Sequence, residues 1–231
     1  MIPIGLLGGS SDQATADYYR RINQAVNAKL GEYNTGEVLI NSMNFQRVSN
    51  AVHHGRWDEL GVYLAQRAKA LEFAGAGVLL CVSNTLHRLA PEFTAALTIP
   101  FLHIVDPTAD AILAHGLTRV AFLGTKAAMS GDYLQRRYAN QFGIETIMPP
   151  ENAQDVMDRI IFEELCKGQF TRASKTYYLE VISQMHRSGA QGVILGCTEI
   201  PLLINQDDLF HVPMFDTAGL HVAAAVDFSL R

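Results

Sequence analysis

Cys197 has the sequence context of a reactive thiol. It comes shortly after Val193–Leu195, an apolar run typical of a buried strand, and a glycine between them allows a tight turn. Thr198 and Glu199 follow, and Pro201 fits the first turn of a helix. Ligands bind at the carboxyl ends of strands in open α/β sheets, and a helix N-terminus lowers the pKa of a thiol. We therefore expect a functional thiol here, the alternative being a buried structural cysteine.

A second stretch earlier in the chain has the same plan. A glycine-rich turn leads into the apolar run 78–82, and Ser83, Asn84 and Thr85 follow it. A hydroxyl and an amide at a strand end are groups that bind or protonate a substrate. Ser83 thus corresponds to Cys197.

Pairs of similar segments indicate that the chain contains an internal duplication. The pairs are Ser83 with Cys197, 114 positions apart, Gly8 with Gly124, 116 apart, and Pro100 with Pro213, 113 apart. Repeats at nearly one spacing predict two similar lobes. If the lobes are related by a pseudo-two-fold axis, Ser83 and Cys197 lie on opposite walls of one cleft.

Strand and helix patterns alternate along the whole chain. Strands are expected at 2–7, 37–43, 78–82, 101–104, 120–123, 143–148, 193–195 and 214–215, and helices at 12–30, 57–74, 84–93, 108–115, 130–142, 154–166, 171–188 and 217–230. This alternation indicates βαβ units. We predict an α/β fold of two similar lobes, each a mostly parallel sheet flanked by helices. Residues 1–98 with 216–231 form the first lobe and residues 99–215 the second.

Composition excludes several classes of function. The chain has 231 residues, 48% of them hydrophobic, and a net charge of −5, so no basic footprint for nucleic acid is present. No apolar run reaches the ~20 residues of a membrane span, and the N-terminus does not have the pattern of a signal peptide. Three cysteines without a disulfide pattern favour the reducing cytoplasm.

Cofactor and metal motifs are likewise missing from the sequence. There is no His-Glu-x-x-His or Cys-x-x-Cys, so we expect no metal. The glycines of residues 5–9 match neither the dinucleotide nor the phosphate-loop pattern, so we expect no nucleotide cofactor.

The candidate residues fit removal of an α-proton from an amino acid without a cofactor. Such a reaction needs a base, a proton donor on the opposite face, and donors that hold the α-carboxylate. Candidate carboxylate ligands are Asn84, Thr85, Thr125 and Thr198, with Ser10 and Ser11 at the end of the first strand. Glu199 is able to accept a hydrogen bond from the substrate ammonium group.

These motifs resemble those of the aspartate/glutamate racemase family of cofactor-independent racemases. The resemblance covers essentially the whole chain and is carried by Gly8-Gly9-Ser10-Ser11 with Thr15, by Ser83-Asn84-Thr85-Leu86-His87, and by Gly196-Cys197-Thr198-Glu199-Ile200-Pro201. It implies two α/β lobes with the active site between them, usually a homodimer, and two cysteines that act as opposed bases.

The chain departs from that pattern at one catalytic position. Ser83 stands where the family commonly has its first cysteine, and a serine hydroxyl is a far weaker acid than a thiol. The chain is most similar to the L-aspartate/glutamate-specific racemases, which have threonine there. The resemblance implies that Cys197 is the base for the L-enantiomer and that Ser83, or water beside it, is a weak partner. We therefore expect slow turnover that is biased towards one direction of the racemisation.

Four further residues have two interpretations each. Lys167 matches a lysine that holds the side-chain carboxylate in aspartate racemases, and is otherwise a solvated residue at a helix end. Arg47 lies in the loop after the second strand, where the family places substrate contacts, or is a surface arginine. His87 orients the Asn84 turn or is a core histidine. Cys81 faces the cleft or, more commonly for cysteine, the core.

The sequence therefore predicts a cytoplasmic enzyme that racemises L-glutamate or L-aspartate as a small-molecule substrate. Cys197 and Ser83 are its catalytic residues. One alternative is a single-cysteine decarboxylase or isomerase of the same superfamily. The other is a non-catalytic binding protein for an acidic metabolite. A proton-exchange measurement separates the three.

Overall fold

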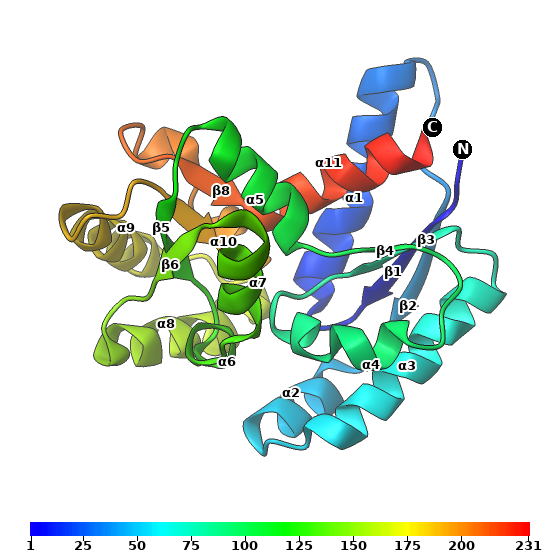
Figure 1. The fold of residues 1–231 in the computed structure, drawn as a ribbon, viewed down its shortest axis with the longest axis horizontal. Helices are drawn as coiled ribbons and strands as arrows, with labels where there is room; N and C mark the ends of the chain where they lie inside the picture. Colours follow the sequence, from blue (N-terminus) through cyan, green and yellow to red (C-terminus); the bar gives the residue numbers. More distant parts are fainter. The chain divides into compact units, whose positions relative to one another are not determined.

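The computed structural model describes all 231 residues, which divide into two compact units. The first unit is Met1–Ile104 with His221–Arg231, and the second is Val105–Leu220. Each unit contains one parallel four-stranded sheet flanked by helices (Figure 1). The predicted α/β fold of two lobes with parallel sheets is confirmed. The unit boundary lies six residues beyond the expected one at 98/99, and the intervening strand pairs within the first sheet.

The first sheet has the strand order β2-β1-β3-β4. The elements of this unit are β1 (Ile4–Gly8), α1 (Asp12–Leu30), β2 (Val38–Ser42), α2 (Phe45–His53), α3 (Trp57–Phe73), β3 (Val78–Cys81), the 3₁₀ helix η1 (Thr85–Leu89), α4 (Ala90–Thr94) and β4 (Phe101–Leu102). The two central strands are apolar and fully buried, as expected for parallel strands covered on both faces.

Alternate residues of the first sheet face two different layers of helix. Leu7 and Leu79 pack with α3 and α4 in one apolar cluster. Tyr18 and Ile22 of α1 are fully buried as well, and the phenol of Tyr18 bonds with His221 of the C-terminal helix. Since side chains on a strand alternate between faces, α1 and α3 cover opposite faces of the sheet (Figure 1).

The second sheet has the strand order β6-β5-β7-β8. Its unit contains α5 (Val105–Ala114), β5 (Arg119–Leu123), α6 (Lys126–Ser130), α7 (Tyr133–Phe142), β6 (Glu145–Ile147), α8 (Glu151–Glu163), the 3₁₀ helix η2 (Leu165–Lys167), α9 (Arg172–Arg187), β7 (Val193–Leu195), α10 (Ile200–Leu203), the 3₁₀ helix η3 (Gln206–Asp208) and β8 (Met214–Asp216). Helices α8, α9 and α10 share one buried cluster with β5 and β7.

The two sheets have the same internal topology. In each, the first strand along the chain pairs with both the second and the third, and the third pairs with the fourth. Pro100 and Pro213 each precede the fourth strand of their sheet. This equivalence supports the duplication inferred from the sequence.

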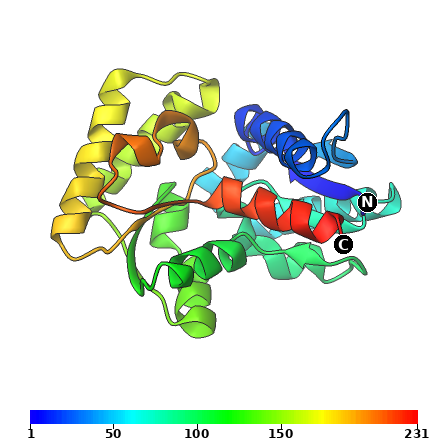
Figure 2. The same ribbon diagram turned by 90° about the horizontal axis from the view of Figure 1, so that it is seen from above.

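The last helix, α11 (Thr217–Ser229), is shared between the units. Its first residues belong to the second unit, where the Thr217 hydroxyl donates to the Leu195 carbonyl at 2.9 Å. From His221 on it belongs to the first unit. There Ser229 accepts from the Ile2 amide at 2.8 Å, which brings the two ends of the chain together (Figures 1 and 2).

Two helical segments differ from the sequence prediction. Residues 45–53, in the expected loop after the second strand, form α2, which the Asn44 side chain caps by accepting from the Gln46 amide. The helix expected at 130–142 begins only at Tyr133, as α7, and the short helix α6, which was not expected, precedes it and ends at Ser130, before the extended backbone of Gly131.

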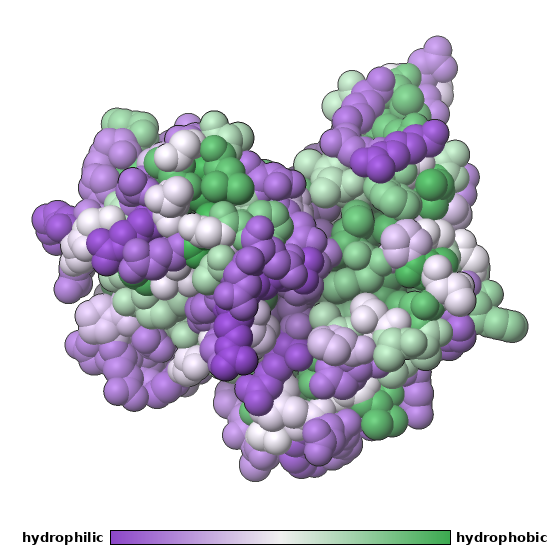
Figure 3. Space-filling model, in the orientation of Figure 1, coloured by the Kyte–Doolittle hydropathy of each residue, from purple (hydrophilic) through white to green (hydrophobic).

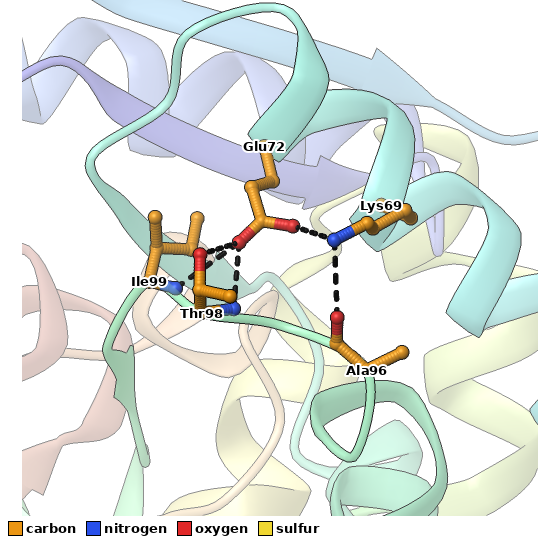
Figure 4. A network of polar contacts seen from close by, with 5 residues as sticks. All are labelled: Lys69, Glu72, Ala96, Thr98 and Ile99. Carbon is orange, nitrogen blue, oxygen red and sulfur yellow. Dashed lines mark hydrogen bonds and ion pairs between the residues drawn. The ribbon is translucent and has the colours of Figure 1, made fainter.

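A half-buried carboxylate, that of Glu72, links α3 to the segment that leads into β4 (Figure 4). One oxygen of Glu72 accepts from the amide and the hydroxyl of Thr98, both at 2.6 Å, and from the Ile99 amide at 3.2 Å. The other oxygen pairs with Lys69, which also donates to the Ala96 carbonyl at 3.1 Å. These bonds lower the pKa of Glu72 to about 2.

The surface of each unit mixes hydrophilic and apolar residues (Figure 3). The most exposed large apolar side chains are Phe73 on α3 and, in two separate loops, Tyr33 and Phe210; single exposed apolar residues of this kind are normal for a protein surface. No helix is both long enough and apolar enough to span a bilayer.

Candidate active site

Gly196 sets the position of Cys197 at the carboxyl end of β7. A Cβ atom at residue 196 would lie 2.2 Å from the Phe122 ring, so only glycine fits between the strands there. The Gly196 amide donates to the Leu123 carbonyl at 2.6 Å, which continues the pairing of β7 with β5 for one residue. The next residue therefore leaves the sheet at a fixed point.

The thiol of Cys197 is part of a buried polar cluster centred on one carboxylate. The Cys197 Sγ and the Thr198 hydroxyl both donate to Oε2 of Glu199, each at 3.0 Å. The thiol of Cys166, on η2, lies 3.8 Å from Oε1. Cys197, Thr198 and Glu199 are each no more than 6% exposed.

This environment raises the pKa of the Cys197 thiol well above its ordinary value. Burial is the largest cause, followed by the negative charge of Glu199. The expectation of a pKa lowered by a helix N-terminus is wrong, because burial and the adjacent carboxylate both disfavour the thiolate. Cys197 rests as a thiol whose proton already points at an acceptor.

In the first unit, a turn of two glycines brings α1 to the end of β1. Gly9 has φ +80°, and a Cβ there would meet the backbone of Met43 at 2.1 Å. The Gly9 amide donates to the hydroxyl of Thr15 at 2.8 Å, and that hydroxyl donates to the Ser11 carbonyl at 2.7 Å. The Thr15 hydroxyl, which lies on α1, thus bridges the two backbone segments of this turn.

The Ser10 and Ser83 segments meet at the same edge of the first sheet. The Ser10 hydroxyl donates to the Val82 carbonyl at 2.6 Å. Ser83, which is half-buried, accepts from the Leu86 amide at 3.3 Å through its hydroxyl oxygen. This leaves the Ser83 hydroxyl proton available for another acceptor. Asn84 and Thr85 follow at the start of η1.

A model of the Asp/Glu/Hydantoin racemase family matches residues 5–225. The chain belongs to this family. It is 38% identical to a putative Asp/Glu racemase from Yersinia pestis and 32% identical to an aspartate racemase homologue from Pyrococcus horikoshii OT3, with TM-scores of 0.90 and 0.85 and full coverage of both chains in each case. An aspartate racemase from Picrophilus torridus shares the fold at 20% identity, with a TM-score of 0.80 over 99% of this chain and 94% of the other.

Family membership makes the chain an isomerase of the amino-acid racemase type. The resemblance stated from the motifs is thereby confirmed. The equivalence of the two strand ends fits it too. Ser83 lies two residues beyond the end of β3, and Cys197 lies two residues beyond the end of β7.

The other residues predicted for this racemase occupy varied positions. Thr125 and Ser11 are buried, and their hydroxyls accept from the amides at the start of α6 and α1. Lys167 is exposed on η2. Arg47 lies on α2 rather than in a loop, and its guanidinium stacks 3.9 Å above the Tyr63 ring. Substrate contacts by these four residues stay predictions.

Two cysteines have roles that the sequence did not establish. Cys81 is fully buried in the apolar cluster around α3, where burial raises the pKa of its thiol, so it belongs to the core. Cys166 lies beside Glu199, although no local pattern in the sequence connects it with Cys197. No group of three or more His, Cys, Asp or Glu side chains is arranged to hold a metal ion.

Proposed function

We propose that the chain racemises L-glutamate or L-aspartate without a cofactor, with Cys197 as the base for the L-enantiomer. The observation that carries the proposal is the 3.0 Å hydrogen bond from the Cys197 thiol to Glu199. A thiol with a raised pKa acts as a base only when its proton has an acceptor, and the carboxylate supplies one.

The reaction consists of two proton transfers at the α-carbon. Glu199 takes the Cys197 proton, and the resulting thiolate removes the α-proton of the L-substrate. The electron pair of the broken C–H bond is delocalised into the α-carboxylate, which Asn84, Thr85, Thr125 and Thr198 stabilise by hydrogen bonds. Ser83, or a water molecule beside it, protonates the opposite face of the carbon and gives the D-enantiomer.

Several finer features belong to the same proposal. Ser10 and Ser11 lie at the end of β1 and would support the substrate carboxylate, while Arg47 and Lys167 are cations suited to its side-chain carboxylate. An unpaired catalytic thiol suits the reducing cytoplasm, and a homodimer is the assembly that the family resemblance favours.

Proton exchange in D2O, followed by proton NMR, tests the proposal. L- and D-glutamate and L- and D-aspartate are offered separately to the parent enzyme and to Cys197→Ala. We expect loss of the α-proton signal with an L-substrate, slowed about a thousandfold in Cys197→Ala, together with D-product.

The other outcomes of this experiment distinguish between the alternative functions. Exchange without D-product indicates a one-base enzyme whose Ser83 side is inert. Absence of exchange with all four substrates contradicts the proposal. Proton incorporation into a decarboxylated malonate would then identify the decarboxylase, and ligand binding alone would identify a binding protein.

A further inference from the structure

The chain passes from one unit to the other at two points, called here the first and the second passage. Histidines of the first unit lie at both. The first passage is at Ile104–Val105 and the second at Leu220–His221. The Ile104 amide donates to Nε2 of His87 at 3.1 Å. The second passage ends in His221 itself, and the centroids of the two imidazole rings are 6.1 Å apart. One cluster therefore contacts both connections.

The hydrogen bonds of His87 fix its tautomer. Nδ1 lies 2.6 Å from the Ser83 carbonyl, which only accepts, so Nδ1 carries the proton. The Ile104 amide only donates, so Nε2 carries none. The ring is 2% exposed, and each of its nitrogens bonds to a different backbone segment. A single neutral imidazole thus joins the turn of Ser83 to the last residue of the first unit.

His221 has a complementary arrangement. Its Nε2 lies 2.9 Å from the Leu102 carbonyl, so this nitrogen carries the proton and Nδ1 accepts from the Tyr18 hydroxyl at 3.1 Å. The carbonyl that it contacts is two residues before the first passage. His103, between that carbonyl and Ile104, packs edge-on against His87 with centroids 4.5 Å apart.

We propose that His87 is a positioning residue of this racemase. Its ring links the backbone of the Ser83 turn to the backbone of the first passage. The proposed proton donor, Ser83, and the connection to the second unit are therefore held by the same side chain. The effect on catalysis rests on the proposed role of Ser83. The effect on the two backbone segments does not.

Two substitutions distinguish between the two hydrogen bonds that the His87 ring makes. In His87→Asn, the side-chain amide nitrogen can replace Nδ1 and keep the bond to Ser83, but nothing reaches the Ile104 amide. In His87→Gln, the side-chain oxygen can replace Nε2 as an acceptor for Ile104, but the donor to Ser83 is lost. His115→Asn is the control, because the His115 ring is exposed and lies in the second unit, where its Nδ1 bonds to the Ala111 carbonyl one turn earlier at 2.8 Å.

Amide hydrogen exchange, resolved to single residues by mass spectrometry, is measured for the parent and the three variants. We expect the Ile104 amide to exchange about tenfold faster in His87→Asn, with the Leu86 amide unchanged. In His87→Gln, we expect the reverse pattern and a loss of D-product formation larger than the loss of L-substrate exchange. Equal responses of both amides in both variants, or none in either, would overturn the proposal.

A measurement on the unmodified protein removes any dependence on how the variants fold. The ¹⁵N shifts of the imidazole nitrogens report which of them is protonated. We expect protonated Nδ1 and unprotonated Nε2 for His87, and a ring protonated at Nε2 would refute the bridge. Neither the shifts nor amide exchange requires turnover. Failure of the racemase proposal is therefore distinguishable from failure of this one.

Discussion

At the scale of single residues, the carboxylate beside Cys197 has two opposing effects. Its negative charge raises the pKa of the thiol, which disfavours the thiolate, and in the proposed mechanism its oxygen accepts the thiol proton when the thiolate forms. In the proposed mechanism, Cys197 stays protonated until the substrate is bound. The positive ammonium group of the substrate then favours formation of the thiolate.

Glu199→Gln separates these effects. Because the substitution removes the charge, the pKa of Cys197 should fall, and alkylation of Cys197 by iodoacetamide at neutral pH should become faster. The α-proton exchange with the L-substrate should become slower by about a hundredfold, because the proton acceptor is lost. Peptide mass spectrometry after timed alkylation gives the first quantity, and NMR in D2O gives the second.

The control for this prediction is Glu163→Gln, which neutralises an exposed carboxylate of the same unit. It should change neither rate by more than about twofold, since exposed charges are screened. If alkylation and exchange both slowed in Glu199→Gln, the carboxylate would be a structural support rather than a proton acceptor.

Candidate site residues could be predicted from the sequence where a local pattern marks their position. Cys197 and Ser83 both follow apolar runs, and a strand end is a local feature. The contact of Cys166 with Glu199 depends instead on the packing of η2 against the segment before α10, which no local pattern encodes. The expected pKa of Cys197 failed for the same reason, because burial is a property of the assembled core.

At the scale of elements, the glycine turn after β1 is the most constrained connection of the first unit. Gly9→Ala should lower the free energy of unfolding by about 3 kcal/mol, because it combines a left-handed backbone with a clash against Met43. Trp57 is the only tryptophan and lies in the first unit, so its fluorescence in urea follows the unfolding of this unit.

Gly31→Ala is the matched comparison for this turn. Gly31 also has a positive φ, +73°, but a Cβ there meets nothing within 4 Å. Its cost should be about 1 kcal/mol, from backbone strain alone. Equal losses for the two substitutions would mean that Met43 moves aside without cost.

The Glu72 bonds predict how the stability of the first unit depends on pH. The pKa is about 2 in the folded protein and near 4.3 for an unperturbed glutamate, so the folded state binds its proton more weakly. The stabilisation is therefore complete above about pH 5 and is lost as the pH falls towards 2. The urea midpoints of the parent and Glu72→Gln, followed by Trp57 fluorescence, should differ at pH 7 and converge at low pH.

Glu92→Gln, at an exposed position of α4, serves as the reference for Glu72. Its urea midpoint should match that of the parent at every pH. A difference between Glu72→Gln and the parent that persists unchanged at pH 2 would show that the glutamine is destabilising through its shape rather than its charge.

Element boundaries could be predicted where a strong apolar pattern met a clear stop signal. Helix α3 was expected at 57–74 and lies at Trp57–Phe73. Helix α2 was missed because only Val48 and Ala51 are buried on it, and packing against α3 rather than a long apolar stripe stabilises it. This misplaced Arg47, which was expected in a loop.

At the scale of the whole molecule, the repeated sheet topology was predictable because the duplication preserves spacing. Strand order β2-β1-β3-β4 in one unit corresponds to β6-β5-β7-β8 in the other. The position two residues after the third strand is therefore equivalent in both, yet one copy has a hydroxyl and the other a thiol. The chain combines a repeated scaffold with two different side chains, a hydroxyl and a thiol, at the proposed proton-transfer positions.

That asymmetry predicts the effect of Ser83→Cys. A thiol has a pKa near 8.5 and forms an anion far more readily than a serine hydroxyl. The substitution should therefore supply a base for the D-enantiomer and raise α-proton exchange of the D-substrate at least tenfold, with little change for the L-substrate, for which Cys197 is the proposed base. Ser83→Thr retains a hydroxyl and should give no such gain. Equal exchange of the D-substrate in Ser83→Cys and Ser83→Thr would mean that residue 83 does not contact the substrate, and that water alone protonates the second face.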